Sequence, residues 1–307
     1  MSRMALDNVV KGKLDKPFRL VVTGTEGVGK STFASEAPNP IFIAAEDGTA
    51  QLDVVRFPSP NDWDEAKECM RVLRKETHEY QTIVIDTLDW LEPLCWASVC
   101  KELDVSSIAD ADYGRGYTAA VDQWRLFLAS LDRLRMEKNM NVIAIAHTHI
   151  KGFKNPEGLD YDRYELKLHA KTAGLWKEWS DAVLHCKFET FVSELKGRKR
   201  GISSGKRIIC TERTAAYDAK NRYNLPNVMP LHWATFAAAL KSGETMPVAD
   251  AMAMIEELAA KTDEAIRKEA AKYVKAAAGD SRKLAQIVNW LKNKVVSEEE
   301  ETVDDDS

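Results

Sequence analysis

Residues 18–31 read FRLVVTGTEGVGKS, and the fold expected for the rest of the chain depends on this stretch. An apolar run comes first, a loop with glycines follows, and the last residues begin an expected helix. The stretch fits the spacing G-x4-G-K-S/T, at Gly24, Gly29, Lys30 and Ser31. Glycines let successive backbone N–H groups turn toward a phosphate, while the lysine reaches its oxygens and the serine hydroxyl ligates Mg²⁺. The stretch therefore predicts a loop that binds a nucleoside triphosphate, with ATP and Mg²⁺ as its ligands.

The alternative to a phosphate loop is a glycine turn that binds nothing. The flanking residues argue against it, because residues 20–22 read as a buried strand and residues 32–34 continue as a helix. A strand, a loop and a helix in this order are what the motif requires. Nucleotide contacts are therefore expected along the whole loop: Gly24, Thr25, Glu26, Gly27, Val28, Gly29, Lys30, Ser31 and Thr32.

Charge is distributed unevenly along the 307 residues. The formal net charge is −5, but seven acidic residues lie in the last ten positions, so the rest of the chain is slightly basic. That pattern is compatible with a nucleic-acid binder. The hydrophobic and charged fractions, 45% and 30%, are those of a globular protein, and no apolar run suits a signal peptide or a membrane span. We expect a cytoplasmic protein without a membrane partner.

The five cysteines form no C-x-x-C pair and stand mostly in apolar runs. They are Cys69, Cys95, Cys100, Cys186 and Cys210. Because disulfide and metal sites show characteristic cysteine spacings, we expect reduced thiols in the core instead.

Apolar strands alternate with amphipathic helices through the middle of the chain. After the phosphate loop we expect strands at 41–45, 82–86 and 141–146, and helices at 61–75, 88–103, 119–138 and 171–180. Residues 105–117 and 152–166 read as loops, and strands at 182–188 and 206–212 bracket a basic link at 196–201. This alternation predicts an α/β fold with a mostly parallel sheet flanked by helices and an antiparallel hairpin at its edge.

Composition divides the chain into four parts. A polar and flexible lead at 1–17 precedes a catalytic core at 18–230. Residues 231–296 form a C-terminal module of alanine-rich helices, expected at 233–240, 249–260, 263–278 and 281–295. Residues 297–307 form an acidic tail that is expected to be disordered. The helical module is too small and too loosely apolar to be a second catalytic domain.

In an open parallel sheet, ligands bind beyond the carboxyl ends of the strands, so residues at those ends are the first candidates for a site. Asp86 is the candidate for a second Mg²⁺ contact opposite Ser31, although alone it would sooner be read as a helix cap. Glu46 is the candidate general base for water that attacks the γ-phosphate, and the alternative is a solvated carboxylate. His147 is the candidate γ-phosphate sensor, and the alternative is a hydrogen-bonded strand-end histidine.

Three further stretches resemble the RecA-type recombinases and their ring-forming relatives. Residues 41–53, IFIAAEDGTAQLD, resemble the strand and catalytic-glutamate turn of that family. Residues 142–151, VIAIAHTHIK, resemble the strand that carries its γ-phosphate sensor, which is a histidine in some relatives. Residues 219–223, AKNRY, with Leu225 and Pro226 after them, resemble the K-N-R motif of RadA and DnaB-type ATPases. The order of motifs between Lys16 and Pro230 is most similar to phage RecA-fold single-strand annealing proteins.

This resemblance implies a RecA-like ATPase that binds single-stranded DNA as a homo-oligomer, ring or filament, and promotes annealing or recombination. The catalytic residues that it implies are Lys30, Glu46, Asp86, His147, Lys220 and Arg222. The last two would enter the ATP site of a neighbouring subunit and neutralise charge on the transferring phosphoryl group. A phage protein of this kind would work in the cytoplasm of a bacterial host, with a single-strand-binding protein as a further partner to test. The basic link and the C-terminal helices depart from the family pattern.

Cations for the phosphates of single-stranded DNA are expected from two places. They are Lys151, Lys154 and Arg163 after the sensor strand, and Arg198, Lys199 and Arg200 in the basic link. The alternative for both is an ordinary solvated turn. Proximity to His147 favours DNA contact for the first group, because it would couple the nucleotide state to DNA binding. The acidic tail either keeps the protein soluble or competes with DNA for these cations.

Three other functions compete with this reading: a ring helicase or translocase, a switch that assembles on ATP without hydrolysing it, and a small-molecule phosphotransferase. The chain carries no primase-binding or zinc module ahead of its core, which argues against the helicase. Glu46 and the K-N-R run suit water activation and catalysis between subunits, which argues against the phosphotransferase.

Overall fold

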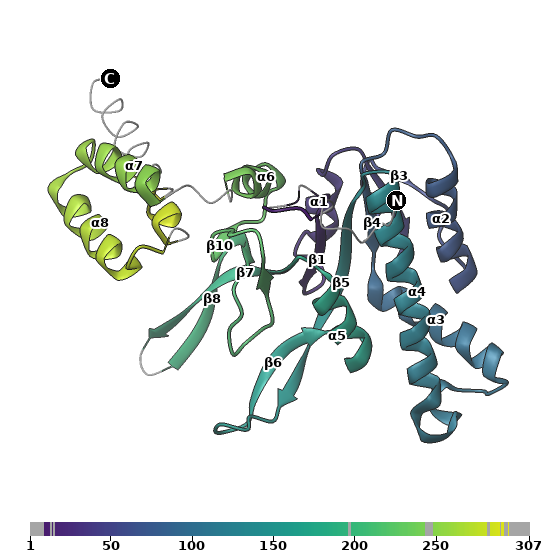
Figure 1. Cartoon of the computed structure of the whole chain (residues 1–307). Coiled ribbons are helices and arrows are strands. Elements are labelled where there is room, and N and C mark those ends of the chain that lie inside the picture. Colours follow the sequence, from purple (N-terminus) through teal and green to yellow (C-terminus); the bar gives the residue numbers. More distant parts are fainter. Residues whose placement is uncertain are drawn as a thin grey trace. The chain divides into compact units, whose positions relative to one another are not determined.

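The computed structural model describes residues 9–12, 14, 16–195, 198–242, 248–280, 283–288, 290–291 and 294, and the side chains of all of these except 191–195, 198–203 and 242. It contains two compact units (Figure 1). The first runs to Cys186 and includes Ala215–Asp218, and the second comprises Lys187–Thr214 and the chain from Ala219 onward. The predicted core at 18–230 thus contributes to both units. The acidic tail at 297–307 and most of the lead at 1–17 lie outside the described residues.

A mostly parallel sheet forms the centre of the first unit (Figure 1). Its strands are β1 (Arg19–Gly24), β2 (Pro40–Ala44), β3 (Val55–Arg56), β4 (Thr82–Asp86), β5 (Asn141–Phe153), β6 (Tyr161–Leu166) and the first residues of β7 (Ala182–Leu195). The order is β7-β1-β5-β4-β2-β3, with parallel pairing between the neighbours. Continuous apolar runs suit strands that are covered on both faces, as β1, β4 and β5 are. The expected α/β class is confirmed.

Helices cover the sheet. They are α1 (Lys30–Ser35), α2 (Trp63–Lys75), α3 (Leu88–Leu103), α4 (Arg115–Glu137) and α5 (Ala170–Trp179). Side chains alternate across a strand, so Ile41, Ile43, Ile83 and Ile85 face α2–α5, where they join one core. That core is rich in aromatic side chains, and the Trp63 and Phe127 rings stack with their centroids 5.0 Å apart. The helices predicted at 61–75, 88–103 and 171–180 are present within two residues.

The segment predicted as a loop at 105–117 is more ordered than expected. It contains two short 3-10 turns, η2 (Ile108–Asp110) and η3 (Asp112–Gly114), and α4 begins at Arg115 rather than at 119. Ile108 is buried, and a Cβ on Gly116 would lie 2.4 Å from the Ile108 carbonyl oxygen. The missing side chain at Gly116 therefore lets this segment pack directly on the first turn of α4.

The prediction of a loop at 152–166 is wrong, because these residues belong to a β-hairpin. β5 continues to Phe153 and pairs antiparallel with β6, from Thr148↔Leu166 to Phe153↔Tyr161 (Figure 1). Polar residues hid the strand in the sequence, since Tyr161–Leu166 reads YDRYEL and only two of its side chains are buried. An antiparallel strand can carry polar side chains on its exposed face and still form its backbone hydrogen bonds, so polar side chains alone do not indicate a loop.

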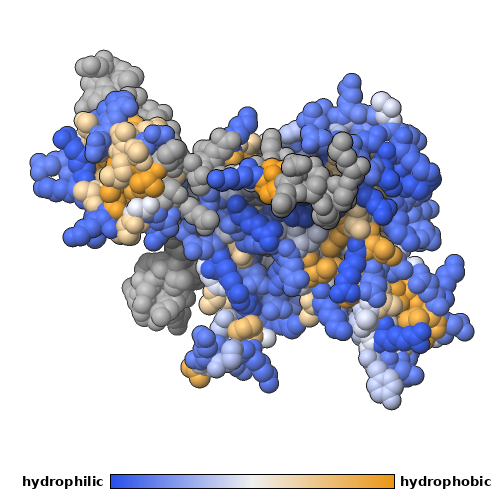
Figure 2. All heavy atoms as spheres, viewed as in Figure 1, coloured by the Kyte–Doolittle hydropathy of each residue, from blue (hydrophilic) through white to orange (hydrophobic). Residues whose placement is uncertain are grey.

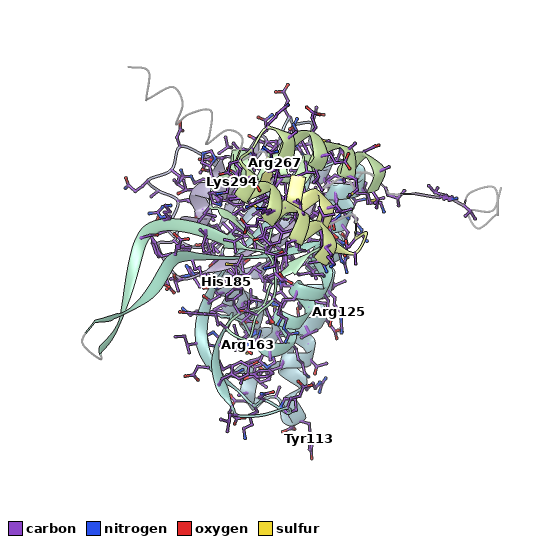
Figure 3. The ribbon with its side chains drawn as sticks, turned by 90° about the vertical axis from the view of Figure 1, so that its left-hand side faces the viewer. Tyr113, Arg125, Arg163, His185, Arg267 and Lys294 are labelled. Atoms are coloured by element: carbon purple, nitrogen blue, oxygen red, sulfur yellow. The ribbon has the colours of Figure 1, made fainter. Side chains whose placement is uncertain are left out.

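Arg163, labelled in Figure 3 and predicted as a DNA contact, is instead 3% exposed and takes part in an ion-pair cluster. Its guanidinium pairs with Asp218, which also accepts a hydrogen bond from Lys177 at 2.6 Å. The guanidinium also lies over the Phe153 ring, 5.1 Å from its centroid. A cation already paired and buried has no surface to offer a phosphate. The prediction for Arg163 is therefore corrected: this side chain joins Asp218 to the hairpin.

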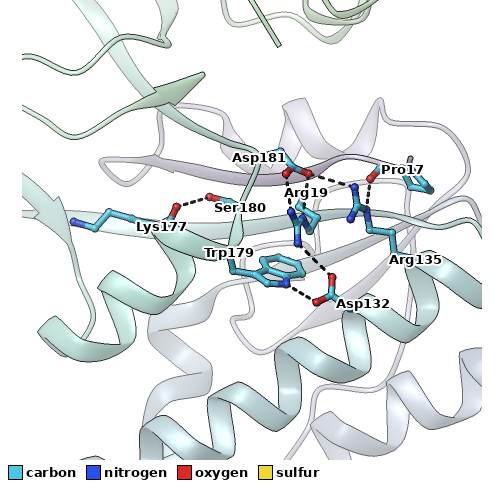
Figure 4. A network of polar contacts seen from close by, with 8 residues as sticks. All are labelled: Pro17, Arg19, Asp132, Arg135, Lys177, Trp179, Ser180 and Asp181. Carbon is cyan, nitrogen blue, oxygen red and sulfur yellow. Dashed lines mark hydrogen bonds and ion pairs between the residues drawn. The ribbon is translucent and has the colours of Figure 1, made fainter. Parts of the chain in front are cut away.

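A second polar network lies at the start of β1, around Arg19 (Figure 4). Arg19 binds both oxygens of Asp181, at 2.7 and 3.1 Å, and its guanidinium lies 5.0 Å from the centroid of the Trp179 ring. The indole of Trp179 donates to Asp132 of α4 at 2.9 Å. Bidentate pairing of this kind fixes orientation as well as distance, so the network holds the start of β7 and α4 against β1.

The second unit contains the rest of β7, β8 (Arg198–Cys210), β9 (Lys220–Asn221), β10 (Val228–Pro230), α6 (Trp233–Ser242), α7 (Val248–Ala260) and α8 (Glu264–Ala277). β8 and β10 pair antiparallel. Of the basic link, residues 196 and 197 lie outside the described residues, and 198–201 begin β8. The C-terminal helices have their own small core, centred on Ala251, Ile255 and Ala270.

All five cysteines are free, and four are buried, as expected for core thiols. Burial raises the pKa of the Cys69 thiol to about 11 and that of Cys95 to about 12. No helix in the described part of the chain is long and apolar enough to cross a membrane. The face drawn in Figure 2 is mostly hydrophilic.

Replacing Asp218 with asparagine is expected to lower the free energy of unfolding at pH 7 by about 2 kcal/mol. Burial would raise the pKa of Asp218, but the hydrogen bond and charge of Lys177 and the charge of Arg163 outweigh it, so the pKa is lowered from its ordinary 3.8. The stabilisation is therefore fully present above pH 3.8 and is lost as the pH falls through the lowered value. Denaturation of wild type and Asp218→Asn across this range, followed by tryptophan fluorescence, measures the difference.

The matched control is Asp162→Asn, which changes an exposed carboxylate of the β5–β6 hairpin, next to the Arg163 that pairs with Asp218. Its effect on unfolding should stay within about 0.5 kcal/mol at every pH. A pH-independent loss at Asp218 would contradict the ion-pair account.

Candidate nucleotide site

The predicted phosphate loop connects β1 to α1 at the carboxyl edge of the sheet. Gly27 and Gly29 have positive φ angles of 71° and 102°, which favour glycine. Gly24 pairs with Cys186 of β7, and a Cβ on Gly24 would lie 2.2 Å from the Cys186 carbonyl oxygen. No real Cβ contact is that short, so the close approach of β7 to β1 requires glycine at this position. The loop shape thus follows from three of its glycines.

Lys30 lies inside the curve of this loop and is 5% exposed. Its ammonium donates hydrogen bonds to the carbonyl oxygens of Gly24 and Thr25, at 3.1 and 2.8 Å. Burial lowers the pKa of Lys30, and the nearby Cys186 and Asp86 oppose the shift. Two carbonyls leave one N–H of the ammonium for another acceptor. An anion at the loop would satisfy that donor.

Asp86 ends β4 and faces the first residues of α1. It is 3% exposed, and its Oδ2 has no hydrogen-bond partner among the described residues. Burial raises the pKa of Asp86 and the charge of Glu46 acts in the same direction, whereas the nearby Ser31 hydroxyl lowers it. A buried carboxylate oxygen without a partner is costly unless a ligand binds it, and hard cations such as Mg²⁺ prefer carboxylate and hydroxyl oxygens. The pair Ser31 and Asp86 therefore fits a magnesium site.

Glu46 and His147 meet at the same edge. The backbone N–H of Glu46 donates to the carbonyl of Asp86 at 3.2 Å, which places Glu46 beside the end of β4. Its carboxylate is 3.9 Å from Nδ1 of His147 and keeps 29% of its side chain exposed. His147 pairs in register with Gly24 of the phosphate loop. The four predicted residues Lys30, Glu46, Asp86 and His147 thus lie together, although they are spread over 117 positions of sequence.

Asp89 is a site residue that the sequence analysis missed. It lies in the first turn of α3, three residues after Asp86, and binds both the backbone N–H and Nδ1 of His147 at 2.9 Å each. An acid in a first helical turn is so common that it carries no signal by itself. Its spacing from Asp86 was the available clue, since that spacing places it beyond the carboxyl end of β4.

Residues 16–223, more than half of the chain, match the family model of the AAA domain. The chain belongs to the AAA domain family. The matched region contains the whole AAA phosphate loop together with Glu46, Asp86, Asp89 and His147.

Three proteins are similar to this AAA domain protein at low sequence identity. The SPbeta prophage-derived uncharacterized protein YorG of Bacillus subtilis (strain 168) is 27% identical over 101 residues, which are 32% of this chain and 31% of YorG. The match thus spans about a third of YorG. The crystal structure of the RadB recombinase aligns with 64% of this chain and 82% of its own, with a TM-score of 0.37 and 16% identity. The flagellar accessory protein FlaH from Methanocaldococcus jannaschii aligns with 71% and 86%, with a TM-score of 0.34 and 12% identity.

The other predicted site residues of this AAA domain protein belong to other elements of the chain. Lys151 and Lys154 are exposed on the hairpin, and the Lys151 ammonium is 3.6 Å from the Glu165 carboxylate. The predicted DNA contacts Arg198, Lys199 and Arg200 lie in β8, and their side chains are outside the description.

The K-N-R run lies in the second unit, where Lys220 is half-buried and Arg222 is exposed. Asn221 between them organises the turn: its Oδ1 accepts from the backbone N–H groups of Tyr223 and Leu225, at 3.1 Å each. The asparagine of the motif is therefore structural, and it fixes the backbone from which the two cations extend.

Replacing Gly24 with alanine is expected to destabilise the AAA domain by about 3 kcal/mol, because the new methyl group would overlap the Cys186 carbonyl and push β7 from β1. Denaturant titration measures the loss. Gly174→Ala in α5 is the control, since a Cβ there meets nothing within 4 Å, and it should leave stability unchanged or raise it slightly. Equal stability of the two variants would contradict the close approach at Gly24.

Proposed function

We propose that this AAA domain protein binds ATP with Mg²⁺ and hydrolyses it, and that it works as an oligomer on single-stranded DNA, in annealing or recombination. One observation carries the proposal: Lys30, Asp86, Glu46 and His147 converge at the carboxyl edge of a parallel sheet beside a glycine loop. A cation, a metal-binding carboxylate, a second carboxylate and an imidazole are the groups that phosphoryl transfer to water needs.

Each residue has a distinct task in this proposal. The loop N–H groups and Lys30 hold the phosphates, and Ser31 and Asp86 hold the metal ion. Bound Mg²⁺ would offset negative charge on the β- and γ-phosphates. Glu46, partly exposed and close to His147, orients and deprotonates the attacking water. His147 contacts the γ-phosphate and responds to its loss.

Oligomer formation and DNA binding extend this proposal. Lys220 and Arg222 would enter the site of a neighbouring subunit, which the ordered turn around Asn221 supports because it fixes the short backbone segment that carries both residues. The similarity to a prophage-derived protein supports a phage origin, and hence a role in the cytoplasm of a bacterial host. The exposed Lys151 and Lys154 would contact DNA phosphates. Since β5 carries both His147 and this hairpin, hydrolysis and DNA contact share one strand.

Subunit mixing tests catalysis across an interface. Glu46→Gln and Arg222→Ala should each retain nucleotide binding and lose about 100-fold in ATP turnover. A one-to-one mixture should recover about a quarter of the wild-type rate, because random assembly pairs an intact Glu46 with an intact neighbouring Arg222 in that fraction of sites. Turnover of the variants, alone and mixed, with and without single-stranded DNA, gives the result.

A mixture of Lys30→Ala with wild type measures how turnover falls when inactive subunits enter the oligomer. Glu76→Gln, which changes an exposed acid after α2, serves as the neutral control. A mixture that stays inactive would place Arg222 in its own subunit's site. Full turnover by Arg222→Ala alone would place Arg222 outside catalysis. Wild-type protein that binds ATP and never hydrolyses it would favour the assembly switch.

Lys154→Ala should weaken binding to single-stranded oligonucleotides and reduce the slope of log affinity against log salt by about 0.7, the value for one phosphate contact. Fluorescence anisotropy from 50 mM to 300 mM salt, roughly the range over which such slopes are measured, gives the slope. Lys75→Ala, which removes an exposed charge from the end of α2, should leave it unchanged. If Lys154→Ala and Lys75→Ala gave the same slope, the hairpin would not be part of the surface that binds DNA.

A further inference from the structure

Asp89 occupies a position where the sheet would otherwise leave an unpaired backbone group. β4 pairs with β5 as far as Ile85↔Ala144, and β5 then continues past the end of its neighbour. At His147 the backbone N–H donates to Oδ1 of Asp89 at 2.9 Å. The carboxylate thus takes the place of the missing strand at this residue.

The second oxygen of the same carboxylate binds the ring. Oδ2 of Asp89 is 2.9 Å from Nδ1 of His147, and the Asp89 side chain is 3% exposed. An ionised carboxylate only accepts hydrogen bonds, so Nδ1 must carry the proton. Nε2 makes no hydrogen bond within the described part of the chain, which leaves it as the nitrogen that can meet a ligand.

Asp89 is not explained by helix capping. The capping position of α3 is Thr87, which makes no side-chain capping bond, and Asp89 directs both oxygens to β5 instead. Burial would raise the pKa of Asp89, but the hydrogen bonds and charge of His147 outweigh it and the pKa is lowered. The carboxylate therefore stays ionised and keeps both acceptors.

We propose that Asp89 is a positioning residue for the reaction: it fixes the tautomer and ring orientation of His147, so that Nε2 is presented to the γ-phosphate. This inference rests on the proposed ATP hydrolysis for its consequence, but the state of the ring can be measured without nucleotide. Asp89 itself touches neither phosphate nor water in this account. It acts through the histidine, as a carboxylate that orients an imidazole does in other sites.

Asp89→Asn tests the proposal sharply because the amide has one acceptor oxygen where the carboxylate has two. The backbone N–H of His147 cannot change its role, so it takes that oxygen, and the amide NH₂ then faces Nδ1. The neutral ring must respond by moving its proton to Nε2. We expect wild-type His147 to carry its proton on Nδ1 and the variant to carry it on Nε2.

Nitrogen-15 NMR of histidine-labelled full-length protein, at a pH where the ring is neutral, distinguishes the two tautomers. The chain has six histidines, and loss of one signal in His147→Gln assigns the resonance. Glu92→Gln is the matched control: it changes a buried acid one turn along α3 that binds the backbone N–H of His169 at 2.9 Å, and it should leave the His147 tautomer unchanged. Wild-type protein with the proton on Nε2 would overturn the proposal without any variant.

Kinetics test the consequence for the reaction. Asp89→Asn should lower kcat for ATP about 10-fold or more while KM changes less than about threefold, and it should add nothing in a His147→Gln background. If the His147 proton moves from Nδ1 to Nε2 in Asp89→Asn and kcat stays unchanged, the positioning role is overturned. If wild type turns over no ATP and the tautomer still exchanges, the placement of the ring is supported and the proposed hydrolysis fails. If wild type turns over ATP and no exchange occurs, only the inference about Asp89 fails.

Discussion

The site depends on the parallel pairing of β5 between β1 and β4. Parallel strands end on the same edge of a sheet, and this order brings the phosphate loop after β1 and Asp86 at the end of β4 to either side of His147. No loop has to reach across the molecule to complete the arrangement. Glu46 joins it because β2 is the next strand beyond β4. The chemistry of the edge is thus a consequence of strand order.

The apolar core explains why that order is stable. Isoleucines of β2 and β4 project onto a layer of helices rich in tryptophan and phenylalanine, and the aromatic rings contact one another at angles that favour edge-to-face packing. At the start of β1, the bidentate pair of Arg19 and Asp181 fixes the orientation of β7 against β1. Burial of this apolar core therefore stabilises the end of the sheet that carries the phosphate loop. The polar residues at that end are not needed to hold the strands together.

The sequence predicted the parts of this structure that depend on local patterns. Apolar runs marked β2 and β4, helical spacing marked α2 and α3, and glycine spacing marked the phosphate loop. The prediction failed at the hairpin, where polar residues on an exposed strand resemble those of a loop. It also failed at Arg163, because its partner Asp218 is 55 positions away and no local pattern connects the two. Asp89 escaped notice for a similar reason, since only the register of β5 shows what its carboxylate meets.

The continuity of β5 limits how the hairpin can vary in length. The strand passes from the buried sheet at His147 to the exposed hairpin at Phe153 without a break. Side chains alternate with a period of two, so one inserted residue between these points would turn every hairpin side chain to the opposite face. Changes in pairs would preserve the pattern and would move the hairpin end by about 6.6 Å each. The stretch of β5 between His147 and Phe153 can therefore be lengthened or shortened in evolution only in steps of two, unless a bulge absorbs the odd residue.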